Sequence, residues 1–140
     1  MKIFWILMSI LMMVVLFISS SIPGTESGEA SMAIAEYIRD TFGISEETLG
    51  VLNFIVRKTA HFLAYFVLSF CVINSLKYFI TNKKAMVITA WGIASLYGVI
   101  DEIHQYFVPG RVCALSDMLI NSAGALVGVL LFLLLSSKKV

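Results

Sequence analysis

Charged residues are scarce in this sequence of 140 residues. Asp, Glu, Lys and Arg make up 14% of it, hydrophobic residues make up 59%, and the mean hydropathy is +0.93. About a quarter of a soluble globular domain is charged, so this composition excludes one and indicates an integral membrane protein. The formal net charge of +1 gives no indication of a nucleic-acid partner, and we expect none.

Cysteine and histidine are also scarce, with two of each. Cys71 lies in an apolar run and Cys113 in a connecting loop. A helix rises about 1.5 Å per residue, which puts roughly 15 Å between Cys71 and the level of the loop, so we expect two free thiols. The histidines lack the spacing of a metal site, and His104 points to a different helix face from Glu102. We therefore expect no metal and no cofactor.

Four stretches have close to the 20 or so apolar residues that are needed to cross a membrane. The first, residues 1–20, ends before Pro23, and we expect it to be retained as a signal anchor rather than cleaved. The later three are residues 58–77, 85–105 and 115–135. The predicted fold is all-α: a four-helix transmembrane bundle with a three-span domain at 58–135 and a cytoplasmic tail at 136–140.

The segment between the first two spans, residues 21–57, is acidic and too polar to cross a membrane. Its six acids are Glu26, Glu29, Glu36, Asp40, Glu46 and Glu47. Ile34, Tyr37, Ile38 and Phe42 recur at helical spacing, which predicts an extracytoplasmic amphipathic helix on the membrane surface. Gly43 ends this helix, and Ser45 begins another that runs into the second span. We interpret the segment as a packed lid without chemistry of its own.

The distribution of lysine predicts the orientation of the chain. If the N-terminus is cytoplasmic, every acidic residue lies on the outer side of the membrane. The cytoplasmic side then has no acidic residue and six lysines: Lys2, Lys77, Lys83, Lys84, Lys138 and Lys139. Cytoplasmic loops of membrane proteins carry such an excess of positive charge. We therefore expect a multi-pass protein of the bacterial cytoplasmic membrane, with both termini cytoplasmic.

Polar residues fall on one face of each of the last three spans, at about 100° per residue. The second span carries Arg57, Lys58, His61 and Tyr65, the third carries Asp101, Glu102 and Gln105, and the fourth carries Asp117 and Asn121. Small residues continue two of these faces inward, at Ala90, Ala94, Gly98, Gly124 and Gly128. Small residues let membrane helices approach closely. We therefore expect the polar groups, with Arg111, to converge in one cavity that opens to the outer surface.

Two interpretations of these polar groups stay open. They form either a closed network that holds three helices together or a site, and ionised groups at bilayer depth favour a site. Arg111 after Pro109-Gly110, with Lys58 or Arg57, suits a phosphate or carboxylate. His61 with Glu102 or Asp101 suits acid/base chemistry, which makes His61, Glu102 and Asp117 the catalytic candidates. The sequence has no nucleophile elbow. We interpret His104 as a residue at the membrane boundary, beside Tyr106 and Phe107.

Three ordered motifs resemble those of the VanZ-like family of bacterial membrane proteins. They are RKTAHFLAYFVL at 57–68, YGVIDEIHQYFVPGR at 97–111, and Ser116-Asp117 with Asn121, Gly124 and Gly128. The resemblance covers residues 57–130. It implies a small polytopic protein of the bacterial cytoplasmic membrane, and the family's namesake lowers susceptibility to teicoplanin-type antibiotics. By position, the resemblance matches the family's motif histidine, aromatic, acid, amide, arginine, aspartate and asparagine to His61, Tyr65, Glu102, Gln105, Arg111, Asp117 and Asn121.

Three functions follow as hypotheses. The leading one is a binding protein for the polar head of a membrane amphiphile: a lipid-linked envelope precursor, a phospholipid or a lipoglycopeptide. Its binding residues are Lys58, His61, Tyr65, Asp101, Glu102, Gln105, Arg111, Asp117 and Asn121. The second is an enzyme that acts on a lipid phosphate. The third is a structural or partner-binding membrane subunit, and the oligomeric state is left open.

Overall fold

A computed structural model describes residues 1–137, and this part of the chain is all-helical, without a β-strand. Its elements are α1 (Lys2–Ser20), α2 (Gly24–Phe42), the 3-10 turn η1 (Glu46–Thr48), α3 (Leu49–Leu76), α4 (Lys83–Tyr106) and α5 (Leu115–Ser137). By length and composition, α1, α4, α5 and the stretch Glu46–Leu76 can each cross a membrane. The predicted all-α class and the four spans are confirmed. Lys138 and Lys139 of the predicted tail lie outside the described residues.

The link from α2 to α3 follows the local signals of the sequence. Gly43 ends α2 with a left-handed backbone (φ 63°), a conformation that a residue without a Cβ adopts at little cost. The hydroxyls of Ser45 and Thr48 lie 2.9 Å apart at the start of η1, and α3 follows without a break. The second spanning helix therefore begins at Leu49, before residue 58, because no proline or polar run interrupts it.

Helix α3 is the centre of the bundle, since it contacts α1, α2, α4 and α5. Its buried face, which includes Tyr65, Leu68 and Val72, packs against small residues of its neighbours. The stripe predicted for the third span is buried in α4, from Ala90 through Ala94 and Gly98 to Gln105. The stripe on α5 is buried at Asp117, Asn121, Gly124 and Gly128. Face analysis of the sequence therefore identified the packing surfaces of α4 and α5.

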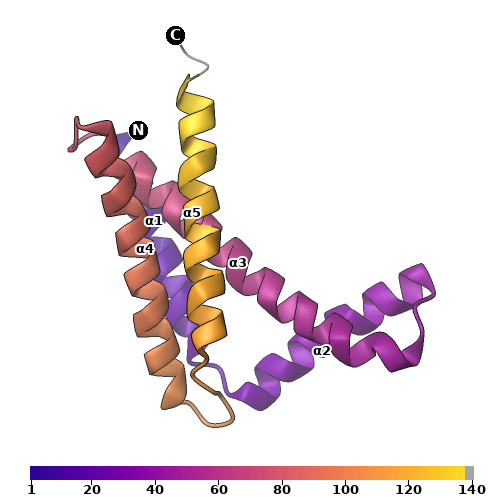
Figure 1. Ribbon diagram of the computed structural model, residues 1–140. Coiled ribbons are helices and arrows are strands. Elements are labelled where there is room, and N and C mark those ends of the chain that lie inside the picture. The colour runs from indigo at the N-terminus through magenta and orange to yellow at the C-terminus, as the bar shows by residue number, and fades with distance from the viewer. Residues whose placement is uncertain (138–140) are drawn as a thin grey trace.

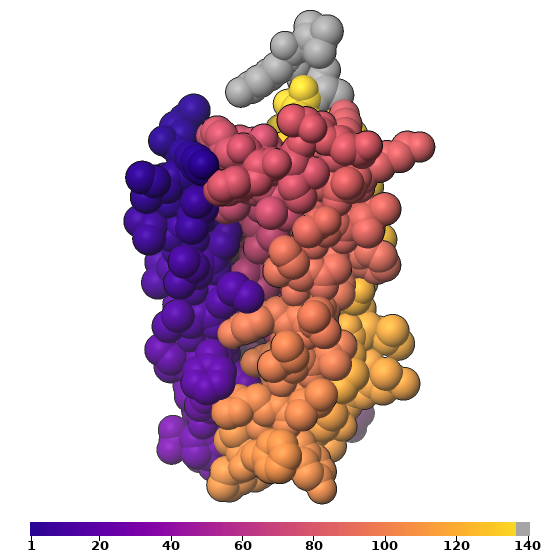
Figure 2. Space-filling model, turned by 90° about the vertical axis from the view of Figure 1, so that its left-hand side faces the viewer, coloured from indigo at the N-terminus to yellow at the C-terminus, as the bar shows by residue number. Residues whose placement is uncertain are grey.

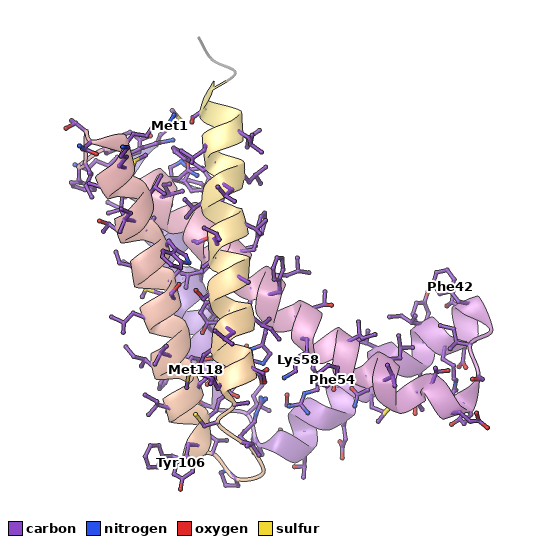
Figure 3. The ribbon with its side chains drawn as sticks, viewed as in Figure 1. Met1, Phe42, Phe54, Lys58, Tyr106 and Met118 are labelled. Atoms are coloured by element: carbon purple, nitrogen blue, oxygen red, sulfur yellow. The ribbon has the colours of Figure 1, made fainter. Side chains whose placement is uncertain are left out.

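The bundle has two distinct ends (Figure 1). The start of α1, the α3–α4 link and the end of α5 lie together at one end, and the α4–α5 loop lies at the other. There α2 and the first half of α3 form an arm that projects sideways, with Phe42 at its tip and Lys58 where α3 reaches the bundle (Figure 3). On one face of the bundle α1 and α4 lie side by side (Figure 2).

Candidate functional site

A cavity of about 540 Å³ lies between α1, α2, α3 and α4, at the end of the bundle that carries the arm. This volume is within the range of small-molecule sites, about 300–1,000 Å³. Apolar side chains form most of its wall, among them Met12, Val15, Leu16, Ala30, Ile34 and Val56. The charged and polar side chains that line it include Glu26, Arg57, His61, Tyr65, Asp101, Gln105 and Arg111. The cavity therefore combines an apolar wall with ionisable groups of both signs.

The α4–α5 loop packs against the junction of α1 and α2, beside the cavity. The Gly24 amide donates a hydrogen bond to the Pro109 carbonyl at 2.9 Å, and Gly110 has a positive φ of 73°. A Cβ on Gly24 would collide with the carbonyl oxygen of Gly110, so the two backbones approach too closely for any larger residue. The turn predicted at Pro109-Gly110 therefore also anchors the start of α2.

Arg111 follows this turn and lines the cavity. Its Nε donates to the Ile22 carbonyl at 3.1 Å, and one terminal nitrogen donates to the Ser19 carbonyl at 3.2 Å, which caps the end of α1. Burial and then the nearby Arg57 lower the pKa of the Arg111 guanidinium, which still stays charged at neutral pH. A guanidinium has five N–H donors; with two engaged, three remain for a ligand.

A second group of polar residues is packed between α3, α4 and α5, and we call it the three-helix cluster. Its members are Lys58, His61, Glu102, Asp117 and Asn121. The ammonium of Lys58 contacts Oδ1 of Asp117. Nδ1 of His61 lies 3.3 Å from Oδ1 of Asn121 and 4.0 Å from Oε1 of Glu102. His61 belongs to this cluster and also lines the cavity, so it connects the two compartments.

Glu102 is fully buried within the cluster. Its Oε2 accepts a hydrogen bond from the backbone amide of Ala114 at 3.2 Å, whereas its Oε1 accepts none from residues 1–137. A buried carboxylate oxygen without a partner is costly, because it has lost its hydration without compensation. This oxygen is the least satisfied charged atom of the site.

Gly98 provides the space in which Tyr65 and Asn121 meet. A Cβ at Gly98 would stand 3.0 Å from the Cβ of Asn121 and 3.2 Å from Cε1 of Tyr65, which is tighter than ordinary contact. The Asn121 Nδ2 is buried and finds no hydrogen-bond partner in the described part of the chain, and the buried Tyr65 hydroxyl lies near the carboxylate of Asp101. Unpaired polar atoms of this kind are rare in protein interiors and mark places where a ligand can bind.

Asp101 and Gln105 occupy the cavity side of α4, where Gln105 Nε2 donates to Asp101 Oδ2 at 3.1 Å. His104 points away from the cluster, as predicted. Its ring stacks on Phe17 of α1 with centroids 4.7 Å apart, and its Nε2 lies 3.1 Å from the Ser21 hydroxyl. His104 therefore helps to dock α1 on α4. Tyr106 and Phe107, by contrast, are exposed and pack edge to face on each other.

All nine residues that the sequence analysis named as binding residues lie at the same end of the bundle. They divide between two compartments that share His61: the cavity, with Tyr65, Asp101, Gln105 and Arg111, and the three-helix cluster, with Lys58, Glu102, Asp117 and Asn121. The single cavity that was expected is thus divided, because the packed faces of α3, α4 and α5 enclose the cluster. The two free cysteines are confirmed.

The sequence analysis missed the contribution of α1 and α2 to the cavity. Ser19, Glu26 and Ser27 line it, and Ser31 and Ala35 of α2 are buried. The signal was present: small residues recur at helical spacing at Ser27, Ser31 and Ala35, on the face that packs inward. The segment 21–57 therefore supplies part of the cavity wall.

An all-helical chain with four membrane-crossing helices and a polar site buried at one end is a multi-pass membrane protein. The chain belongs to the VanZ/LLP1 family, whose sequence profile matches residues 4–136. The match includes α1 and α2, which carry none of the motifs on which the resemblance was based. No curated protein and no solved structure matches the chain.

Proposed function

We propose that this protein binds the polar head of a membrane-borne amphiphile in the cavity between α1, α2, α3 and α4. The observation that carries the proposal is the cavity's composition: Arg57 and Arg111 accompany a wall of apolar side chains. An acyl or polyprenyl chain fits the apolar wall, and a phosphate or carboxylate fits the guanidiniums. Candidate ligands are a lipid-linked envelope precursor, a phospholipid and a lipoglycopeptide. The outer face of the bacterial cytoplasmic membrane is the proposed location.

The other charged residues of the cavity limit which lipid head groups fit it. Glu26 and Asp101 line it together with the two arginines. Asp101 is paired with Gln105, and Arg111 is anchored to α1 while three of its N–H donors stay available. A head group that carries a phosphate together with an amine satisfies both signs of charge. Phosphatidylethanolamine has this chemistry, and so do peptide-bearing lipid-linked precursors.

Arg57 gives the sharpest test of this binding function. Its side chain lines the cavity but makes no hydrogen bond to the side chains or backbone of residues 1–137, so Arg57→Gln removes a ligand contact with little structural cost. We expect short-chain phosphatidylethanolamine to raise the thermal unfolding midpoint of the detergent-solubilised wild-type chain. In Arg57→Gln the apparent affinity is expected to fall at least about ten-fold, the loss of one charge-assisted contact.

Arg39→Gln is the matched control, since it makes the same change of charge on the arm. Arg39 pairs there with Asp40 and Glu46 and does not line the cavity. Equal lipid affinity in both variants would contradict the assignment of the cavity. A teicoplanin inhibitory concentration that overexpression leaves unaltered would show that this member lacks the role of the family's namesake.

Catalysis on a lipid phosphate is the second candidate, and the position of His61 favours it. The ring lines the cavity, while its Nδ1 faces Glu102 and Asn121 behind the cavity wall. A histidine whose Nδ1 is oriented by an amide oxygen, with an acid nearby, can exchange a proton through its other nitrogen with a group in the cavity. Lipid mass spectrometry of cells with and without the protein distinguishes the two functions, because an unchanged lipid profile counts against catalysis.

A further inference from the structure

The three-helix cluster contains two carboxyl groups and one ammonium beside the His61 imidazole. Glu102 and Asp117 supply two carboxylates that are 0% and 8% exposed, and Lys58 supplies one ammonium. Lys58 and the hydroxyl of Ser116 both approach Oδ1 of Asp117, and neither contacts Glu102. A buried carboxylate without a counter-charge is strongly destabilising. A cation beside Glu102 would supply the counter-charge that Lys58 gives to Asp117.

The buried polar atoms of the cluster give an independent reason to expect a ligand. Oε1 of Glu102 is fully buried, accepts no hydrogen bond from residues 1–137, and faces Nδ1 of His61 at 4.0 Å. The amide oxygen of Asn121, which is also fully buried, lies 3.3 Å from the same Nδ1. Oε1 of Glu102 is therefore a buried acceptor between α3 and α4 that lacks a partner, and a bound cation would supply one.

The geometry of the donors is that of a metal site. His61, Glu102 and Asp117 each present one ligand atom, and these atoms all lie within 4.8 Å of one another. Each comes from a different helix: His61 from α3, Glu102 from α4 and Asp117 from α5. One imidazole nitrogen with two carboxylate oxygens is a donor set that suits Zn²⁺ or Mn²⁺.

We propose that His61, Glu102 and Asp117 bind a divalent transition-metal ion, with the amide oxygen of Asn121 beside it as a further ligand. In this arrangement Lys58 occupies Oδ1 of Asp117 and places a like charge near the ion. The ion would lie on the side of His61 that faces α4 and α5, whereas the lipid cavity lies on the side that faces α1 and α2. The metal site therefore does not depend on lipid binding. The proposed metal site also makes Glu102 a metal ligand, a role that a purely structural hydrogen-bond network would not require.

The test measures metal retained by the purified full-length chain in detergent. The chain is stripped with a chelator, exposed in separate samples to Zn²⁺, Mn²⁺, Mg²⁺ and Ca²⁺, desalted and analysed by plasma mass spectrometry. We expect one equivalent of Zn²⁺ or Mn²⁺ per chain and a higher thermal unfolding midpoint in its presence. A wild-type chain that retains neither ion overturns the proposal, whatever the variants do.

Variants then assign the ion to the cluster. Glu102→Gln keeps the shape of the side chain and is expected to weaken binding at least about ten-fold. Asp101→Asn is the matched control, because it removes a carboxylate from the adjacent position, outside the group of ligands. Full retention of the ion by Glu102→Gln, or equal loss in both variants, overturns the assignment. Arg57→Gln must leave metal binding unchanged, which separates this outcome from failure of the lipid site.

Lys58→Gln gives a second readout that a purely structural role of the cluster would not produce. Removal of the ammonium takes a like charge away from the ion and frees Oδ1 of Asp117. We expect the chain to bind Zn²⁺ or Mn²⁺ more tightly, by several-fold, and the metal-dependent rise of the unfolding midpoint to become larger. Weaker metal binding in Lys58→Gln contradicts the proposed arrangement.

Discussion

Lys58 places its ammonium between α3 and α5, where it contacts Oδ1 of Asp117 (Figure 3). The side chains are 21% and 12% exposed, so loss of the lysine leaves a mostly buried carboxylate unpaired. We predict that Lys58→Met lowers the free energy of unfolding of the metal-free chain by about 3 kcal/mol. Equilibrium unfolding in mixed micelles measures the change.

A double-mutant cycle identifies the cause of this loss. Asp117→Asn removes the charge that Lys58 would leave unpaired, so Lys58→Met combined with Asp117→Asn is expected to be more stable than Lys58→Met alone. Additive effects of the two substitutions would show that no coupling exists between these residues. Arg39→Gln, which breaks exposed ion pairs on the arm, is expected to leave the unfolding midpoint unchanged.

Glycines of α5 set how closely this helix packs on α3. A Cβ on Gly124 would collide with the backbone carbonyl of Phe62, and one on Gly128 would collide with the carbonyl of Phe66 and the hydroxyl of Ser69. Backbone atoms cannot move aside as a flexible side chain can. We predict that Gly124→Ala lowers the free energy of unfolding by about 1–3 kcal/mol, the usual cost of overpacking.

Gly92→Ala in α4 is the control for this prediction. Gly92 is exposed, and no atom lies within 4 Å of the position that its Cβ would take. Alanine favours a helix over glycine by roughly 0.5–1 kcal/mol, so Gly92→Ala is expected to leave stability unchanged or to raise it. The prediction for α5 is wrong if both alanine variants unfold at the same midpoint.

Helix periodicity predicted which face of each helix is buried better than it predicted which helix packs against that face. The stripe from Ala90 to Gln105 on α4 is buried, as the spacing indicated. The spacing predicted that His61, Glu102 and Asp117 converge. A face does not reveal the distance to another helix, so the sequence could not separate Glu102 in the three-helix cluster from Asp101 in the cavity. It also could not predict that Gly24 contacts Gly110, because that contact depends on how α2 leaves α1. The division of the site into two compartments follows from such tertiary contacts.

Charge is distributed unequally between the two ends of the molecule. The end where α1 begins and α3 meets α4 carries Lys2, Lys77, Lys83 and Lys84 (Figure 1). Lys2 and Lys77 cover aromatic rings there, Phe79 and Trp5 among them. All nine acids of the sequence lie toward the other end, on the arm or in the site. By the positive-inside rule, we infer that the site faces the outer side of the membrane.

The native cysteines allow this orientation to be tested on the whole molecule. Cys113 is partly exposed in the α4–α5 loop, whereas Cys71 is buried at 4% exposure in α3. We predict that a membrane-impermeant maleimide labels Cys113 in intact cells and that Cys113→Ser abolishes the label. In the Cys113→Ser background, Thr81→Cys in the α3–α4 link is expected to react only after the membrane is permeabilised. The reverse pattern would place both the cavity and the three-helix cluster on the cytoplasmic side, where lipids of the outer leaflet could not reach them.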